Sequence, residues 1–370
     1  MRIFVSLGIV VLLLSCTPST STQVNQAKLE ELNNALKKDR IADVHSVLVD
    51  YRGDRIFEGY YGAPDEDWGD ALGEVMHTPD RKHDLRSVSK SVTTLLLGMA
   101  LGEDWQEDLG RTLGSLFPDR YGDMEKGVDS VTLEDVLTMQ AGIEWNEMTE
   151  PYGDADGNYS LINDENRLYE TDDPLGLVLG RKVITKPGSE WYYNGGLTQL
   201  LGFIVQSETN ESFEAFLEDR LFGPLDINDY DWRRARNWPV ANPPATASGL
   251  RLTAPDMAKI GELVLARGRW NGEQLVDPGW IDAMTARHVE TIPWFNEEGI
   301  NCGYGFMWYR GEIGTDDVIF ASGNGDQKIM IFPGRELVIT IQAGRYNDFT
   351  QPTERLVAQA VLAAISGDGG

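Results

Sequence analysis

A serine and a lysine three residues apart, Ser87 and Lys90, form the pattern S-x-x-K at the start of an apolar segment. Three residues of an α-helix turn through roughly 300°, so the two side chains share one face, one turn apart. Apolar neighbours such as Val92, Leu95 and Leu96 would desolvate the lysine and disfavour its ammonium form. A neutral amine beside a hydroxyl can take the serine proton, which makes the pair a candidate nucleophile and base. The bare pattern also fits an ordinary surface lysine.

The sequence around this pair resembles a known family. LRSVSKSVTTLLLG is similar to the nucleophile helix of the serine β-lactamase, penicillin-binding protein and class C-like esterase superfamily. Further segments resemble segments of that family and occur in the same order along the chain. They are VTLEDVLTMQAGIEWNE (131–147), PGSEWYYNGGLTQLLGFIV (187–205), and LFGPLDI with GLRLTAPDMAKIGELVL. Together the matches extend from about residue 45 to 345. The resemblance implies a serine hydrolase that works through an acyl-enzyme on Ser87 and needs no cofactor.

Two adjacent tyrosines compete for the catalytic tyrosine that the resemblance implies. The literal motif Y-x-N selects Tyr192 with Asn194, whereas the family's spacing from the proline-glycine turn and to the later Leu-Leu-Gly selects Tyr193. We prefer Tyr193. It would relay a proton between Ser87, Lys90 and the leaving group, provided that nearby ammonium charge lowers its pKa from about 10.

The family's third motif, K-T-G or H-x-G, is expected just before residue 328, where the sequence reads SGNGDQ (322–327). An asparagine, Asn324, stands in place of a cation that faces the substrate carboxylate in β-lactamases, and Asp326 adds an anion. This departure weakens the case for β-lactam substrates. The resemblance still implies an oxyanion hole, made by the amide of Ser87 and a backbone amide within Asn324, Gly325, Asp326 and Gln327.

The function expected from these residues is therefore hydrolysis of a small-molecule ester, amide or peptide substrate. A β-lactamase or D,D-peptidase activity is the first alternative. A non-catalytic binding protein of the cell envelope with the same fold is the second. The aromatic stretch at Tyr304, Phe306 and Trp308 is interpreted as strand core, although it would also suit an apolar acyl group near the site.

Other signatures of catalysis or metal binding are missing from the sequence. It has no G-x-S-x-G, no H-E-x-x-H and no phosphate-binding glycine loop, and its four histidines are isolated from one another along the chain. Cys302 is the only cysteine besides Cys16, so no internal disulfide is expected in the mature chain. Asp154, Asp156, Asn158 and Glu165 have the spacing of a calcium-binding EF-hand, but Tyr159 replaces its required glycine. No metal is expected.

The composition limits the partners. The 370 residues carry 32 Lys and Arg against 59 Asp and Glu, a net charge of -27. Such a surface repels nucleic acid and anionic lipid, so neither is expected to bind directly. The acidity is otherwise interpreted as a solvated surface that favours solubility. The sequence does not indicate an oligomeric state.

The first residues differ in kind from the rest. Arg2 precedes an apolar run, residues 3–14, that is too short to span a bilayer of about 30 Å, and then come Ser15 and Cys16. LLSC resembles the lipobox of bacterial lipoproteins. The resemblance implies a signal peptide over 1–15, a lipidated Cys16 with a polar tether over 16–24, and an anchored protein at the cell envelope, in the outer membrane or periplasm if the source has one. An ordinary secretory signal with a chance cysteine is the alternative.

Hydrophobic periodicity predicts how the candidate residues are positioned. A helix is expected from about residue 26 to 40, strands over 45–51, 55–62, 318–323, 328–333 and 336–344, and a helix over 356–365. Capping signals, such as Thr132 with Asp135, mark helices in between. We therefore expect an α/β (α+β) fold, in which an antiparallel sheet with flanking terminal helices (25–86 plus 291–370) is interrupted by a mostly helical subdomain (87–290).

Overall fold

The computed structural model describes residues 24–38, 41, 43–150, 152, 160–295, 300–348 and 353–366. The predicted signal peptide, Cys16 and the tether up to residue 23 lie outside these ranges. So do Asp154, Asp156 and Asn158 of the EF-hand-like spacing.

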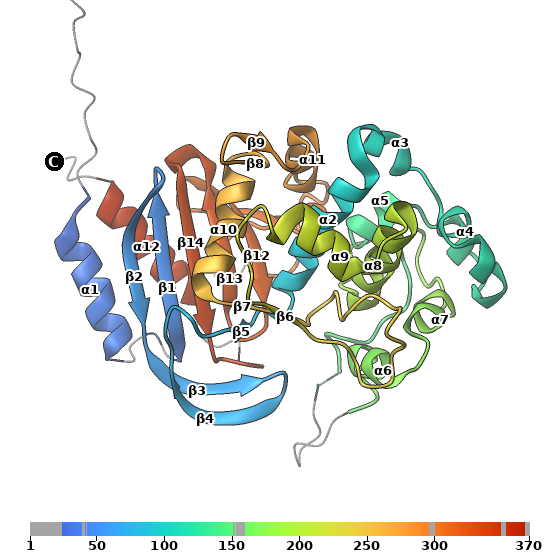
Figure 1. The fold of residues 1–370 in the computed structure, drawn as a ribbon, viewed down its shortest axis with the longest axis horizontal. Coiled ribbons are helices and arrows are strands. Elements are labelled where there is room, and N and C mark those ends of the chain that lie inside the picture. Colours follow the sequence, from blue (N-terminus) through green and yellow to red (C-terminus); the bar gives the residue numbers. More distant parts are fainter. Residues whose placement is uncertain are drawn as a thin grey trace, which may run out of the picture.

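A seven-stranded antiparallel sheet joins the two ends of the chain (Figure 1). Its strand order is β10-β11-β12-β13-β14-β1-β2, and every neighbouring pair is antiparallel. The strands are β1 (Val44–Tyr51), β2 (Asp54–Tyr60), β10 (Gly303–Tyr304), β11 (Tyr309–Ile313), β12 (Asp316–Gly323), β13 (Gln327–Phe332) and β14 (Leu337–Ala343). This arrangement confirms the expected fold class.

Both faces of the sheet are covered, because all residues of the central strands β1, β13 and β14 are buried. Helices α1 (Gln26–Lys37) and α12 (Thr353–Ile365) pack against each other on one face, and α10 (Ala254–Leu265) packs on β13, β14 and β1 from the other (Figure 1). In α1 the apolar positions Leu29, Leu32 and Leu36 are buried, as their spacing predicts. The helix ends at Lys37, three residues earlier than expected.

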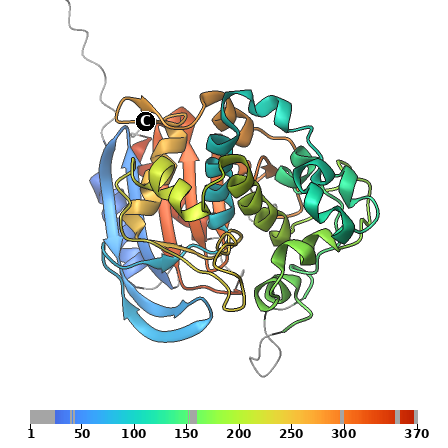
Figure 2. The same ribbon diagram turned by 45° about the vertical axis from the view of Figure 1, so that its right-hand side comes forward.

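A group of helices lies beside the sheet (Figure 2). Helix α2 (Val88–Leu101) stands between the two parts and contacts both α8 and β12. The remaining helices are α3 (Trp105–Asp108), α4 (Leu113–Leu116), α5 (Leu133–Leu137), α6 (Asp164–Glu170), α7 (Pro174–Leu179), α8 (Gly195–Thr209), α9 (Phe213–Leu217) and α11 (Pro278–Met284). The predicted division into two subdomains stays a prediction, and α10, which falls within 87–290, packs on the sheet.

Short strands complete the fold and lead the chain into the helices. They are β3 (Gly62–Asp67), β4 (Asp70–Met76), β5 (His83–Asp84), β6 (Asp231–Trp232), β7 (Leu250–Leu252), β8 (Arg269–Trp270) and β9 (Glu273–Gln274). Strand β5 pairs with β7 immediately before α2 begins. This pairing fixes the position at which the chain enters the candidate catalytic helix.

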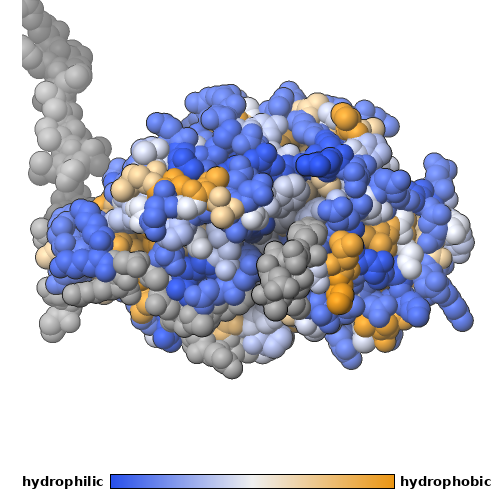
Figure 3. Space-filling model, turned by 90° about the horizontal axis from the view of Figure 1, so that it is seen from below, coloured by the Kyte–Doolittle hydropathy of each residue, from blue (hydrophilic) through white to orange (hydrophobic). Residues whose placement is uncertain are grey.

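The surface agrees with the acidic composition. On the face drawn in Figure 3, hydrophilic residues predominate and the apolar patches are separated from one another. Among the residues that the structure describes, no helix has the length and apolar character needed to span a bilayer.

Candidate active site

Ser87 stands at the junction of β5 and α2, in a backbone conformation that exposes its hydroxyl. It is the N-cap of α2, yet its side chain makes no capping hydrogen bond. The preceding residue, Arg86, has φ of 47°, a left-handed conformation that costs a non-glycine residue about 1–2 kcal/mol. This sharp turn carries the chain from the strand into the helix and leaves the Ser87 hydroxyl available to a ligand.

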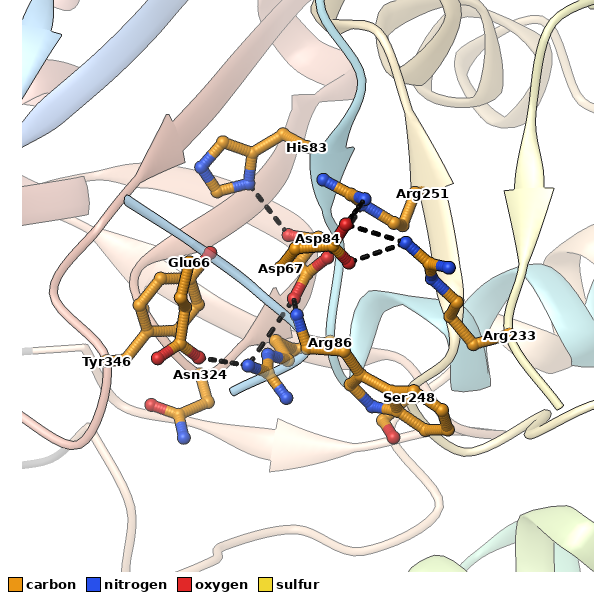
Figure 4. A network of polar contacts seen from close by, with 12 residues as sticks. Glu66, Asp67, His83, Asp84, Arg86, Arg233, Ser248, Arg251, Asn324 and Tyr346 are labelled. Atoms are coloured by element: carbon orange, nitrogen blue, oxygen red, sulfur yellow. Dashed lines mark hydrogen bonds and ion pairs between the residues drawn. The ribbon is translucent and has the colours of Figure 1, made fainter. Parts of the chain in front are cut away.

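An ion-pair network holds this strained turn in place (Figure 4). The Arg86 guanidinium pairs with Glu66, and its Nη2 atom lies 3.4 Å from Asp84 Oδ2. Asp84 also lies 2.8 Å from Arg251 Nε and accepts a 2.6 Å hydrogen bond from the Trp68 backbone amide. These partners come from the β3–β4 hairpin and from β7, so two segments that are distant in the sequence support the residue before Ser87.

The structure brings Ser87, Lys90 and Tyr193 together. Lys90 Nζ donates a 2.9 Å hydrogen bond to Ser87 Oγ, and the Tyr193 hydroxyl donates a 2.8 Å bond to the same oxygen. Lys90 is 2% exposed, and its Nζ atom also donates a 2.9 Å hydrogen bond to the Ala247 carbonyl oxygen. The predicted nucleophile, the predicted base and a third proton-carrying group thus meet at one atom, the geometry required for activated nucleophilic catalysis.

Of the two adjacent tyrosines, only Tyr193 contacts the nucleophile. Its ring lies between α2 and the Trp294 side chain, with ring centroids 4.7 Å apart. The next residue, Asn194, caps α8 by accepting a hydrogen bond from the Leu197 amide, which fixes the position of the tyrosine. Tyr192 donates its backbone amide to Met139 and does not line the cavity at Ser87.

The protonation of Tyr193 differs from the sequence-based expectation. Burial, together with the nearby negative charge of Glu147, raises the pKa of Tyr193 well above its ordinary value, although the hydrogen bond with Ser87 opposes this shift. The condition that nearby ammonium charge lowers this pKa is therefore not met, which favours the phenol over the phenolate as the form that relays the proton. Tyr193 is a neutral phenol that donates to Ser87 and can supply a proton.

The segment predicted to supply the oxyanion hole lies at the same site, but its residues differ in orientation. Asn324 and Asp326 line the cavity, whereas Gly325 and Gln327 do not. The Gln327 amide group is buried and donates to the Ala343 carbonyl at 2.6 Å, which anchors the turn between β12 and β13. Which backbone amide would complete the oxyanion hole stays a prediction.

Gly323, which the sequence analysis left out, packs closely against the nucleophile. A Cβ atom at this position would lie 3.2 Å from the Ser87 amide nitrogen and 2.3 Å from the Leu85 carbonyl oxygen. Only glycine therefore lets the end of β12 approach the Ser87 backbone. The Gly-Asn-Gly stretch in the sequence indicates a close backbone approach at this point, but it does not show which segment lies beside it.

The interpretation of Asp326 as an added anion needs a correction. Its carboxylate accepts a 2.7 Å hydrogen bond from Thr353 Oγ1, and it lies 3.2 Å from Arg345 Nε and 4.0 Å from Lys328 Nζ. Burial raises the pKa of Asp326, and the charge of Lys328 opposes this shift. The anion is balanced within the protein, and Lys328 supplies the cavity with a cation that Asn324 does not.

Ser87 opens into a cavity of about 290 Å³. Its walls combine apolar and aromatic side chains with a few charged ones, a composition typical of small-molecule sites. The residues that line it are Ser87, Glu147, Met148, Tyr152, Tyr193, Trp294, Phe295, Tyr309, Ser322, Gly323, Asn324, Asp326, Lys328 and Glu354. The residues Tyr304, Phe306 and Trp308 are fully buried and absent from this lining, in agreement with a core role.

Besides Glu354, sequence reasoning missed the buried carboxyl group of Glu147 at this site. It accepts hydrogen bonds from Trp145 Nε1 at 2.8 Å and from the Gly195 amide at 2.7 Å. Burial, followed by repulsion from Glu165, raises the pKa of Glu147 to about 7, and the charge of Lys90 opposes this shift. A carboxyl group that changes charge near neutral pH thus lies beside the catalytic groups.

Comparison with known proteins identifies the family of this chain. A family profile described as Beta-lactamase matches residues 37–362. The chain belongs to the β-lactamase family. Its residues Ser87, Lys90 and Tyr193 therefore occupy a fold that is shared with that family, although their individual roles stay predictions.

Individual relatives are distant. The chain is 26% identical over 267 residues to the 6-aminohexanoate-dimer hydrolase of Paenarthrobacter ureafaciens, covering 70% of this chain and 60% of that protein. It is 22% identical over 217 residues to Protein flp of Staphylococcus aureus strain N315, covering 58% of this chain but only 40% of that protein. A penicillin-binding protein homologue from Caulobacter crescentus superimposes with a TM-score of 0.70 at 16% identity, covering 92% of this chain and 97% of that one. This structural similarity shows that the two chains share a fold.

Proposed function

We propose that this protein is a serine hydrolase that cleaves an ester or amide bond through an acyl-enzyme on Ser87. The observation that carries the proposal is the pair of hydrogen bonds at Ser87 Oγ, 2.9 Å from Lys90 Nζ and 2.8 Å from the Tyr193 hydroxyl. Ser87 and Tyr193 line a cavity with aromatic walls that can hold a small substrate. A relative named for a hydrolase of an amino-acid dimer adds support.

The mechanism follows from the roles that these groups can take. In its neutral form Lys90 accepts the proton of Ser87 as Oγ attacks the substrate carbonyl. Backbone amides at Ser87 and at the turn after β12 stabilise the oxyanion. The neutral phenol of Tyr193 then gives its proton to the leaving group, and the proton on Lys90 restores it. In the second half of the reaction a water molecule takes the place of the leaving group. It gives its proton to Tyr193 and attacks the acyl carbonyl, and Ser87 Oγ then leaves with the proton from Lys90.

The cavity favours esters and amides with an apolar acyl part over β-lactams. Trp294, Phe295 and Tyr309 form an aromatic wall, which suits an aliphatic or aromatic acyl group. The position at which β-lactamases carry a cation for the substrate carboxylate holds Asn324, whose side chain is engaged with Asn347 at 2.8 Å. Lys328 lies in the cavity but donates to Ser322 Oγ at 2.8 Å and faces Glu354. A β-lactamase or D,D-peptidase activity is the alternative.

Labelling with a fluorophosphonate probe tests the proposal. Wild type should become covalently labelled, because the activated Ser87 hydroxyl attacks the phosphorus atom. The Ser87→Ala variant should not be labelled, whereas Ser189→Ala, which changes an exposed serine, should label like wild type. Equal labelling of wild type and Ser87→Ala would contradict the proposal. Failure of wild type to label, under conditions that label a related esterase, would favour a non-catalytic binding protein.

The same preparations define the substrate class. A panel of p-nitrophenyl esters, D-amino-acid peptides and a chromogenic cephalosporin separates the alternatives by their kcat/KM. Faster turnover of the esters or peptides agrees with the absence of a cation at Asn324. Faster turnover of the cephalosporin would move the assignment to a β-lactamase.

For location, we propose that Cys16 anchors the protein to the cell envelope through a lipid. The support is the sequence pattern alone, an apolar run followed by LLSC. A net charge of -27 requires a covalent anchor, because anionic lipid would repel the folded domain. Mass spectrometry should find a lipid on residue 16 of the mature chain, and Cys16→Ala should move the protein to the soluble fraction. An unmodified Cys16, or a wild type found wholly in the soluble fraction, would contradict the proposal.

A further inference from the structure

Three of the four histidines in the chain meet in the protein interior, together with one aspartate. His45 lies in β1, Asp65 in β3 and His83 in β5, and His77 follows the end of β4. All four are buried, and one nitrogen or carboxylate oxygen from each lies within 4.8 Å of the others. Histidines that are isolated from one another along the sequence thus meet in the folded chain. We infer that this cluster, named here the histidine cluster, binds one divalent transition-metal ion, for which Zn²⁺ fits best.

The hydrogen bonds around the cluster determine which nitrogens face its centre. His45 Nε2 lies 3.0 Å from the Pro64 carbonyl oxygen, and His83 Nδ1 lies 2.9 Å from the Asp84 carbonyl oxygen. A carbonyl oxygen can only accept, so these two nitrogens carry the hydrogens. In neutral rings, His45 Nδ1 and His83 Nε2 are then bare acceptors. Histidines that bind metals show this same pattern, in which the outer nitrogen donates to a carbonyl.

The two bare nitrogens face each other at 2.7 Å. Two lone pairs at this distance repel unless a proton or a cation lies between them. A shared proton would join only His45 and His83. It would leave His77 Nε2 and Asp65 Oδ2, which lie 3.4 Å apart in the interior, without a hydrogen bond. One cation can contact all four side chains, so it satisfies every polar atom that the cluster leaves without a partner.

The donor set and its dimensions suit zinc. Three imidazole nitrogens and one carboxylate oxygen form a four-ligand set that Zn²⁺ prefers in tetrahedral geometry. Zinc–ligand distances of about 2.0–2.1 Å place tetrahedral ligands roughly 3.4 Å apart. His83 Nε2 lies 3.4 Å from Asp65 Oδ1, and His45 Nδ1 lies 3.9 Å from the same oxygen. Small rotations of buried rings would complete the tetrahedron.

A site with four protein ligands is closed to substrate, so the metal would act in the structure and not in the reaction. It would tie the large sheet, through His45, to the β3–β4 hairpin, through Asp65 and His77. Through His83 it would also hold β5, the strand that leads directly to Arg86 and Ser87.

The histidine cluster is also linked to the turn that carries Asn324. The Tyr346 ring stacks near His83, with centroids 6.3 Å apart, and its Cδ1 atom would lie 2.7 Å from a Cβ atom at Gly325. Figure 4 shows His83, Tyr346 and Asn324 in one view of this region. The metal would therefore support both the segment that carries Ser87 and the turn that carries Asn324.

Metal analysis of the full purified chain tests the inference. After incubation with Zn²⁺ and dialysis against metal-free buffer, wild type should retain about one zinc per chain by elemental mass spectrometry. His77→Ala should retain less than a tenth of that amount. His288→Ala is the matched control, because it removes the one exposed histidine, outside the cluster, and it should retain zinc like wild type.

Thermal unfolding of wild type supplies a second measurement that does not depend on a variant folding. Removal of the metal with 1,10-phenanthroline should lower the Tm by about 5 °C or more, and added Zn²⁺ should restore it. Labelling of Ser87 can persist in either case, so this test is separate from that of the hydrolase. A wild type that retains no zinc and shows no change of Tm with chelator or Zn²⁺ would overturn the inference, as would full zinc retention by His77→Ala.

Discussion

Replacing Ser87 with alanine, or Lys90 with methionine, should each lower kcat by about 10⁴-fold. Replacing both should lower it little further, because the two groups act as one unit in the attack on the substrate. Methionine keeps most of the lysine volume in a site that is 2% exposed, so the change removes the amine without opening a cavity. Steady-state kinetics on the best substrate of the panel, with protein folding checked by circular dichroism, measures the effect.

Lys126→Met is the matched control, since Lys126 is an exposed lysine away from the cavity. It should leave kcat unchanged. If Lys90→Met retained a tenth or more of the wild-type kcat, Lys90 would not be the base. If the effects of the two single variants multiplied in the double variant, the two residues would act in separate steps.

Replacing Tyr193 with phenylalanine should lower kcat about a hundredfold or more, the usual scale of lost acid-base help. The change removes only the hydroxyl that donates to Ser87 Oγ at 2.8 Å, and the ring can keep its contact with Trp294. Because the buried phenol stays neutral, its loss should affect the departure of the leaving group most. The kcat should therefore fall more for substrates with poor leaving groups than for p-nitrophenyl esters.

Tyr192→Phe is the natural comparison, because it makes the same chemical change one residue earlier, outside the cavity. It should stay near the wild-type kcat. The reverse pattern, with Tyr192→Phe impaired and Tyr193→Phe active, would assign the proton relay to Tyr192 and contradict the hydrogen bond seen at Ser87.

Much of the fold could be predicted from local patterns. The short continuous apolar runs of β12, β13 and β14 identify strands, and the expected boundaries differ from the observed ones by one or two residues. Thr132 and Asp135 form the capping box that their spacing predicts. The β3–β4 hairpin was not predicted, because β4 is largely exposed and lacks an apolar period.

The candidate site, too, could be predicted from local patterns only in part. Ser87 and Lys90 lie within one helical turn, so their spacing alone places them together. Tyr193 needed the family resemblance, because it reaches Ser87 from a distant segment. The partners of Asp326, which include Arg345 and Thr353, come from segments that only the tertiary fold brings together. No short-range pattern marks such contacts.

The histidine cluster shows the same limit most clearly. His45, Asp65, His77 and His83 have no metal-ligand spacing, because three different strands and the end of a hairpin carry them. The hydrogen bond between His83 and the Asp84 carbonyl is local, but the meeting of the rings depends on how β5 lies beside β1 and β3. Sequence spacing identifies sites on one element, whereas this one is built between elements.

The place of β1 inside the sheet affects how the chain can fold during synthesis. Strand β2 follows β1 at once, but the other neighbour, β14, is made about 290 residues later, since Val47 pairs with Ile341. Helix α1 likewise lacks its packing partner until α12 is made. The Asn25 backbone amide, at the start of α1, donates a hydrogen bond to the Ala364 carbonyl oxygen of α12. Until then the β1–β2 hairpin has an open hydrogen-bonding edge and a bare apolar face, a state prone to wrong pairing. The many long-range contacts favour slow folding, which is completed only after β14 and α12 have been made.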